Sequence, residues 1–175
     1  TIEEAVSDLA TGSLTSQGDC IYVLQGHAEN VDEADWLSEL STLAGLSIVG
    51  VGTGTMRPRL TWTIATSTLL MDTANLELAN FNLYLAGAHA AGSALTVAEP
   101  ITVSGAGCRI VNNFIYWGYD ADQIVGTGII WTGTDGVFAN NRCIALVAAQ
   151  PTETLLRLTA ADRIQIVGNY IFGPT

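Results

Sequence analysis

The chain has 175 residues, of which 49% are apolar and only 13% are charged, and its mean hydropathy is +0.35. This composition excludes an intrinsically disordered chain, which combines low hydrophobicity with high charge. Seventeen acidic residues stand against six arginines and no lysine, which leaves a net charge of −11. Nucleic acids and anionic membranes are therefore not expected partners, because both require a basic face.

The length suits a single domain that spans residues 1–175. The sequence contains no run of 18 apolar residues that would predict a membrane span. No basic and apolar leader opens the chain, so a signal peptide is not expected.

The first predicted element is a helix that caps the fold, within residues 1–12. Thr1 and Glu4 form a capping-box pattern, in which each side chain bonds the backbone N–H of the other residue. Over residues 2–10 the apolar positions fall on one helical face, as Ile2, Ala5, Val6 and Leu9. A solenoid needs such a plug to cover its open end.

A first strand is predicted over residues 18–24, followed by a turn at 25–27. Residues 29–42 are acidic and contain Trp36 and Leu37. The pattern allows either a lateral loop or a short helix in this segment. The segment and the N-terminal helix are both candidate contact surfaces for a partner.

An internal repeat then governs the rest of the chain. Five segments align on a Gly or Asn anchor at 30, 32, 28 and 28 residue intervals: Gly50, Asn80, Asn112, Asn140 and Gly168. Two positions before each anchor stands a large apolar residue, as Ile48, Leu78, Ile110, Phe138 and Ile166. The position after the last three anchors carries Asn113, Asn141 and Asn169. Asn accepts positive φ at tight turns, and stacked Asn amides can bond along a ladder.

Strand-like runs rich in Thr, Ile, Val, Leu and Trp separate these segments, at residues 60–71, 94–103, 128–132 and 154–159. Each repeat therefore holds two or three short strands, which fits one rung of a parallel β-helix. The sequence predicts five or six rungs over residues 18–173. No plug is evident after the last rung, so its apolar end needs a partner subunit or more chain.

The order of motifs resembles the right-handed parallel β-helix proteins of the pectate-lyase-like superfamily. The motifs are the capping helix, then Gly-Asp-x-Ile-Tyr-Val-Leu at 18–24, Gly-His-Ala-Glu at 26–29 and Leu-Ser-Ile-Val-Gly-Val-Gly-Thr-Gly at 46–54. More narrowly, the chain is similar to short β-helix structural proteins of tailed bacteriophages. The resemblance implies an all-β, right-handed, single-stranded parallel β-helix. It also implies two kinds of function, since the superfamily contains polysaccharide-degrading enzymes as well as spikes, fibres and head decorations.

The catalytic pattern of pectate lyases cannot be carried over to this chain. That pattern needs calcium-binding carboxylates beside a basic residue, and only Arg57 and Arg59 lie close together, without an acidic cluster in register. The best carboxylate pair for glycoside hydrolysis is Asp120 and Asp122, with Tyr116, Trp117 and Tyr119 nearby as sugar-stacking candidates. A solvated loop with aromatic packing is the favoured interpretation of this segment, so no catalytic residue is assigned.

No cofactor is predicted either. A metal site from Asp19, His27 and Glu29 is conceivable, but the spacing matches no standard ligand set and favours a structural turn. The three cysteines, Cys20, Cys108 and Cys143, are expected to be buried free thiols.

Four tryptophans, Trp36, Trp62, Trp117 and Trp131, are many for a thin β-helix. We expect some of them on outer faces, where aromatic enrichment with low charge is typical of an assembly interface. A symmetric oligomer follows, and the resemblance to phage spikes favours a homotrimer.

These observations favour a non-enzymatic virion protein. It would be a decoration or cement protein on the surface of a phage head, assembled in the host cytoplasm and contacting the major capsid protein. The alternative is a tailspike or tail-fibre segment that binds or cleaves a bacterial surface polysaccharide. A generic β-helical adhesion module is a third hypothesis.

Overall fold

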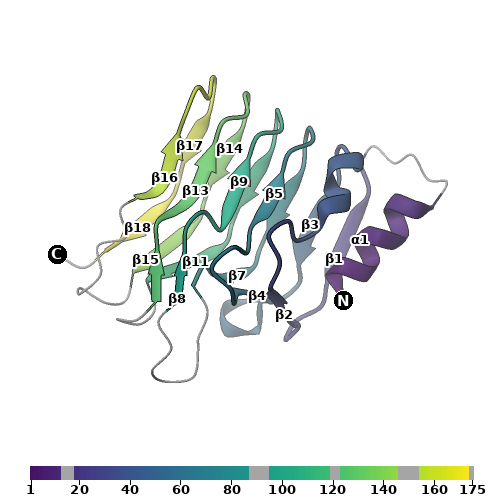
Figure 1. The fold of residues 1–175 in the computed structure, drawn as a ribbon, viewed down its shortest axis with the longest axis horizontal. Helices are drawn as coiled ribbons and strands as arrows, with labels where there is room; N and C mark the ends of the chain where they lie inside the picture. Colours follow the sequence, from purple (N-terminus) through teal and green to yellow (C-terminus); the bar gives the residue numbers. More distant parts are fainter. Residues whose placement is uncertain (13–17, 87–94, 119–122, 146–153, 174–175) are drawn as a thin grey trace.

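A computed structural model describes residues 1–12, 18–86, 95–118, 123–145 and 154–173. Over these residues the chain forms a parallel β-solenoid of about five turns, with one α-helix at its N-terminal end (Figure 1). The predicted parallel β-helix is therefore confirmed. Its right-handedness stays a prediction. No helix within the described ranges is long and apolar enough to cross a bilayer.

Three parallel sheets form the sides of the coil. The first sheet contains β1 (Cys20–Val23), β3 (Ser47–Gly50), β6 (Glu77–Ala79), β10 (Arg109–Val111), β14 (Val137–Ala139) and β17 (Gln165–Val167). The second sheet contains β2 (Ala28–Val31), β4 (Arg59–Trp62), β7 (Asn82–Tyr84), β11 (Phe114–Gly118), β15 (Arg142–Ala145) and β18 (Tyr170–Phe172). The third contains β5 (Leu69–Met71), β9 (Ile101–Val103), β13 (Thr127–Trp131) and β16 (Thr154–Leu158), while β8 (Leu95–Val97) pairs with β12 (Gln123–Val125).

The repeat places equal positions above one another. The residues two positions before the anchors pair in register along the first sheet, as Ile48, Leu78, Ile110, Phe138 and Ile166. A second inward column runs along the second sheet, as Leu60, Leu83, Ile115, Cys143 and Ile171. Because successive side chains of a strand point to opposite faces, one column fills the core while its neighbour faces outward. In the inner coils these inward residues are buried.

The corner between the first and second sheets depends on two adjacent positions. Positive φ, between 56° and 65°, occurs at the anchors Asn80, Asn112, Asn140 and Gly168 and not at the asparagines that follow them. The first anchor differs, since Gly50 is followed by an excursion that contains the 3₁₀ turn η2 (Gly54–Met56). The residue after the anchor carries the Asn ladder.

The Asn ladder links each coil to its neighbours. Asn113 donates its amide to the Leu78 carbonyl at 3.0 Å and accepts the Phe81 N–H at 2.8 Å. Asn141 does the same one coil later, bonding the Ile110 carbonyl and the Asn113 N–H, each at 2.9 Å. Asn169 continues the pattern, and its carbonyl oxygen accepts from the Asn141 N–H at 2.9 Å. The predicted ladder is confirmed, and the buried amides are satisfied by backbone groups that the corner would otherwise leave unpaired.

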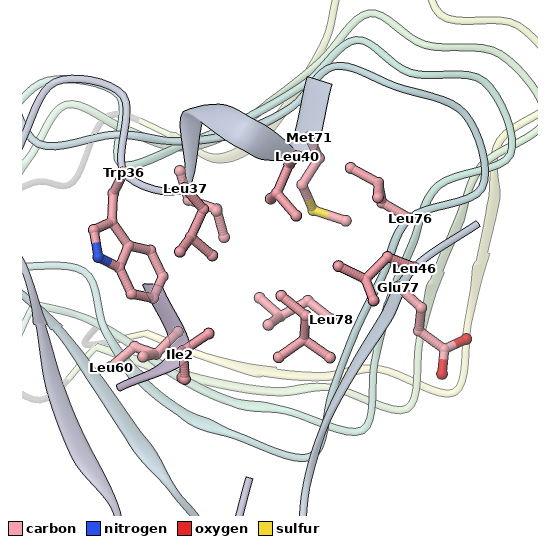
Figure 2. A pocket seen from close by; sticks show the side chains of 12 residues that line it. Ile2, Trp36, Leu37, Leu40, Leu46, Leu60, Met71, Leu76, Glu77 and Leu78 are labelled. Carbon is pink, nitrogen blue, oxygen red and sulfur yellow. The ribbon is translucent and has the colours of Figure 1, made fainter. Parts of the chain in front are cut away.

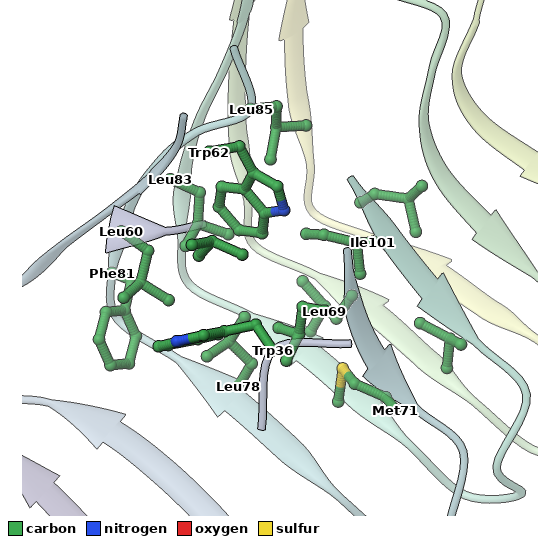
Figure 3. Packing of buried hydrophobic residues seen from close by; sticks show 14 of the residues in the cluster. Trp36, Leu60, Trp62, Leu69, Met71, Leu78, Phe81, Leu83, Leu85 and Ile101 are labelled. Atoms are coloured by element: carbon green, nitrogen blue, oxygen red, sulfur yellow. The ribbon is translucent and has the colours of Figure 1, made fainter. Parts of the chain in front are cut away.

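Some of the four tryptophans were expected on outer faces, but three of them are buried in the interior. Trp36, Trp62 and Trp131 are at most 1% exposed. Figure 3 shows Trp36 and Trp62 among the packed core residues. Trp62 donates its indole N–H to the Pro100 carbonyl at 2.7 Å. Gly136 lies directly against the Trp131 ring, where any Cβ would collide with it. The interior has room for indoles because a small residue faces a large one. Trp117 is partly buried and packs against the same core.

The helix α1 (Ile2–Thr11) closes the N-terminal end, close to its predicted bounds. Thr1 and Glu4 form the predicted capping box, and Ile2 and Val6 are buried. Ile2 meets Trp36, Leu37 and Leu40 around a small apolar space (Figure 2). The cavity there measures about 10 Å³, at the lower limit for a single water molecule. It is packed core and offers no ligand site.

Of the two structures predicted for the acidic segment 29–42, a lateral loop or a short helix, its second half forms the short helix. Its first residues belong to β2, Trp36 forms an isolated parallel bridge with Leu69, and η1 (Ser38–Thr42) is a 3₁₀ helix that contacts α1. The segment therefore completes the third side of the first coil.

The last coil has a neighbouring coil on one side only, over the residues that the structure describes. The strands β16, β17 and β18 are each the last member of their sheet. Their large apolar side chains are about half-exposed: Leu158, Ile166, Val167, Tyr170, Ile171 and Phe172.

Candidate functional site: an arginine–aromatic groove

The outer face of the second sheet concentrates arginine and aromatic side chains. One outward column contains Arg59, Asn82, Phe114, Arg142 and Tyr170, paired strand to strand. The next outward column contains Thr61, Tyr84, Tyr116, Ile144 and Phe172. The parallel register thus brings residues more than 80 positions apart onto one surface.

A groove of about 500 Å³ lies on this face, within the range of small-molecule sites. Its lining includes residues of the turn before β2 and of the excursion after β3. Its lining contains two arginines, three aromatic residues, an amide and a histidine, within the set Gly26, His27, Ala28, Gly54, Thr55, Arg57, Arg59, Asn82, Tyr84, Phe114 and Tyr116. No carboxylate belongs to this set of described residues.

Aromatic rings hold the guanidinium groups in place. The Arg57 Cζ lies 4.5 Å from the Phe114 ring centroid, and the Arg142 Cζ lies 5.6 Å from the same ring. Arg59 lies over Tyr84 at 6.0 Å. Tyr84 and Tyr116 stack on each other with centroids 4.5 Å apart. Cation–π contact and ring stacking reduce the freedom of these side chains before any ligand arrives.

The arginines of this face differ from the others in their partners. Arg109 pairs with Glu77 at 2.7 Å, Arg157 with Glu99 at 3.3 Å, and Arg163 with both Asp135 and Asp162. By contrast, no described carboxylate lies within 4.0 Å of Arg57, Arg59 or Arg142 in an ion pair. Although the chain has a net charge of −11, the three arginines without an acidic partner among the described residues lie on one face.

Arg57 is the most enclosed of the three. Burial lowers the pKa of its guanidinium, and the nearby Tyr116 opposes this effect. One terminal nitrogen donates to the Asn112 carbonyl at 2.6 Å, while the buried Nε has no partner among the described atoms. A desolvated cation without a carboxylate partner favours an incoming anion.

The sequence identified part of this site. Arg57 and Arg59 lie together as expected, and Tyr116 lines the groove. The carboxylate pair Asp120 and Asp122, together with Tyr119, lies outside the described residues. Trp117 points to the core side of β11 rather than to the groove. Sequence reasoning missed Arg142, Phe114 and Tyr84, although counting two or four positions after each anchor would have placed them on the outer face.

Two residues of the conceivable metal site, His27 and Glu29, form hydrogen bonds at the start of the N-terminal helix instead. The His27 Nε2 and Glu29 Oε2 atoms are 2.7 Å apart, and the Glu29 carboxylate accepts the Ile2 N–H at 2.8 Å. Glu29 also accepts the Glu3 N–H at 3.3 Å, so it caps the first turn of α1. Asp19 lies in a shallow hollow with Asp8 on the flank of that helix. No cluster of three metal-binding side chains exists among the residues that the structure describes.

The fold and the groove define a β-solenoid with an outward-facing, cationic and aromatic surface. Comparison with known families, curated proteins and solved structures finds no match, so the assignment of the fold rests on the coil geometry itself.

Proposed function

We propose that the chain is a carbohydrate-binding β-solenoid whose arginine–aromatic groove binds an acidic polysaccharide of a bacterial surface. The observation that carries the proposal is the segregation of the arginines. Three are paired with carboxylates elsewhere, and three meet aromatic rings on the groove face.

The chemistry of the groove suits uronic-acid sugars. A guanidinium group binds a carboxylate through two parallel N–H donors, and such charge-assisted bonds are the stronger kind. The Tyr116 hydroxyl at the groove offers a partner for a sugar hydroxyl. The groove also spans several stacked coils, from β2 to β11, which suits an extended polymer better than a small compact ion.

Binding is tested by calorimetry with a uronic-acid polymer such as alginate, against neutral dextran. We expect the polymer to bind and dextran not to bind. Arg59→Gln should weaken the binding about 10-fold or more, since a charge-assisted hydrogen bond contributes about 1.5–3 kcal/mol. Arg59 lines the groove and is exposed, so the fold should survive the change.

Arg109→Gln is the matched control. It removes the same charge from an exposed, paired arginine on the first sheet. Equal losses in both variants would reduce the effect to net charge and contradict the groove. Equal binding of alginate and dextran would contradict the acidic ligand. If the polymer became shorter in the same mixture, the chain would cleave it as well as bind it.

A second candidate function is the head decoration protein, and an exposed apolar patch favours it. Tyr22, Leu24, Val51 and Met56 are all exposed. Their segments adjoin, because β1 pairs with β3 and the Gly26 N–H bonds the Met56 carbonyl at 2.9 Å. Apolar patches of this kind mark protein contacts, and the major capsid protein is the partner we propose for this function.

Immunogold labelling of virions tests the decoration function. An antibody to the chain should label the head surface evenly if the chain decorates the capsid. Label confined to the tail tip would reject decoration and support the polysaccharide-binding proposal. Absence of label from virions would reject a virion location altogether.

A further inference from the structure

Arg142 lies outside the groove but on the same outer face of the second sheet. Its strand β15 pairs with β11, and Arg142 stands in the outward column of Arg59, Asn82 and Phe114. The side chain is exposed, and it does not belong to the groove lining. The cationic face therefore extends beyond the groove.

Two aromatic rings flank the guanidinium group of Arg142. Its Cζ lies 5.6 Å from the ring centroid of Phe114 and 5.6 Å from that of Tyr170. Tyr170 stands in the same outward column, one strand further along. Such cation–π contacts restrict the conformations of an exposed arginine, so less entropy is lost when a ligand binds it.

The Phe114 ring joins this position to the groove. Phe114 lines the groove and also contacts Arg57, whose Cζ lies 4.5 Å from the ring centroid. Arg57 and Arg142 thus share one ring, and neither has a carboxylate partner among the described residues. Because like charges repel each other at short range, an anion bound beside either group stabilises both.

The coil repeat sets the distance from the groove arginines to Arg142. Arg59 belongs to β4 and Arg142 to β15, with β7 and β11 between them (Figure 1). Adjacent strands of a sheet lie about 4.8 Å apart, so the Cα positions of the two arginines are separated by roughly 14 Å along the solenoid axis. A ligand that binds both arginines must therefore be extended and carry more than one anionic group.

No acidic side chain of the described strands stands between these arginines. Asn82 and Phe114 occupy the intervening positions of their column. The neighbouring outward column is uncharged over the same strands, with Thr61, Tyr84, Tyr116 and Ile144. An anionic polymer along this face meets no like charge from the described strands, although the chain as a whole carries −11.

We propose that Arg142, between Phe114 and Tyr170, is a second anionic subsite, and that an acidic polysaccharide bound in the groove runs along the solenoid axis to reach it. This inference rests on the proposed function and adds the direction and the extent of the ligand. One carboxylate binds at Arg57 and Arg59, and a later carboxylate of the same molecule binds Arg142. Joining two contacts in one ligand raises its affinity only if the ligand spans both sites.

Calorimetry with a disaccharide and a hexasaccharide of alginate tests the subsite. The disaccharide is too short to extend from Arg59 to Arg142, whereas the hexasaccharide is long enough. We expect the hexasaccharide to bind the parent chain at least about 10-fold more tightly than the disaccharide. Arg142→Gln should remove most of this advantage and leave the affinity for the disaccharide unchanged. Arg142 is exposed, so the fold should survive the change, and circular dichroism verifies this.

Arg157→Gln is the matched control, because it removes the same charge from an exposed, paired arginine of the third sheet. This variant should keep the advantage of the longer ligand. Equal affinities of the two oligosaccharides for the parent chain would overturn the subsite and leave the proposed function intact. An advantage that Arg142→Gln preserves would have the same consequence.

Two further outcomes would also overturn the subsite. If Arg142→Gln weakened the disaccharide as strongly as the hexasaccharide, Arg142 would be part of the groove itself. If neither oligosaccharide bound the parent chain and the alginate polymer did not bind either, the proposed function would fail and the subsite with it.

Discussion

Two neighbouring asparagines at each corner of the solenoid have different physical roles. Asn140 adopts φ 56° and is exposed, so its conformation is what the corner requires. Asn141 is 1% exposed, and its amide bonds the Ile110 carbonyl and the Asn113 N–H. Glycine can adopt the positive φ of Asn140, but it cannot supply the side-chain hydrogen bonds of Asn141.

Asn141→Gly should therefore destabilise the fold far more than Asn140→Gly. The first change leaves a buried N–H and a buried carbonyl unpaired, at about 1–3 kcal/mol each. The second keeps the positive φ and should cost at most about 1 kcal/mol. Urea unfolding of the two variants checks the difference. Equal losses would show that the ladder contributes no more than the turn.

The exposure of one cysteine differs from the expectation that all three are buried, and it allows a second test. All three were expected to be buried, but Cys20 is exposed, whereas Cys108 and Cys143 are buried. Burial raises the pKa of Cys143 to about 12 and also raises that of Cys108. Thiolates are the reactive form, so the two buried thiols stay protonated near neutral pH.

A thiol reagent at pH 8 should modify one cysteine per folded chain and three per unfolded chain. Cys20→Ser should abolish the fast reaction of the folded chain and leave two slow sites. The absorbance of the released thiolate measures both counts. Rapid modification of two or more thiols in the folded chain would contradict the burial of Cys108 and Cys143.

At the scale of elements, α1 is fixed by a residue outside the helix. Its first turn has one N–H capped by Thr1 and two capped by the Glu29 carboxylate. Glu29 is in turn held by His27. The helix is thus joined to β2 by hydrogen bonds as well as by its apolar face.

Glu29→Ala should loosen the helix while leaving the coils intact. The loss of these caps should cost about 1–2 kcal/mol, the usual range for an N-terminal cap with a dipole contribution. Hydrogen exchange of the amides in residues 2–11 should accelerate, and exchange in β10 should not. Glu33→Ala is the control for charge, because Glu33 is exposed. Unchanged exchange in the helix would contradict the role of Glu29.

The elements were predictable to different degrees from the sequence. The anchors and apolar columns predicted the strands and their register, because stacking forces equal positions into equal environments. The burial of Trp131 was not predictable from its own segment, since it depends on Gly136, which provides the space. The groove was only half predicted for a similar reason. Its residues come from several coils, and their common face appears only when positions are counted from the anchors.

At the scale of the whole molecule, charge and fold act against each other. A net charge of −11 on a small solenoid produces self-repulsion that the folded state must overcome. Raising the salt concentration from about 0.01 M to about 0.15 M shortens the Debye length from about 30 Å to about 8 Å. The melting temperature should rise over this interval by several degrees and then change little.

Differential scanning calorimetry at one protein concentration measures this response. Holding the concentration constant separates screening within the chain from association between chains. A melting temperature that is flat in salt would show that the acidic groups are too far apart to repel one another. A steady rise up to molar salt would indicate a general effect on apolar burial rather than screening.

The constant interval along the Asn ladder has a consequence for how such a chain changes length over generations. Successive members of Asn113, Asn141 and Asn169 are 28 residues apart, and their hydrogen bonds join adjacent coils. A gene duplication that inserts 28 residues at a corner returns every later side chain to its own column. A shorter insertion inside a strand displaces all of them. Descendants of this gene should therefore gain or lose whole coils and confine smaller insertions to the corners.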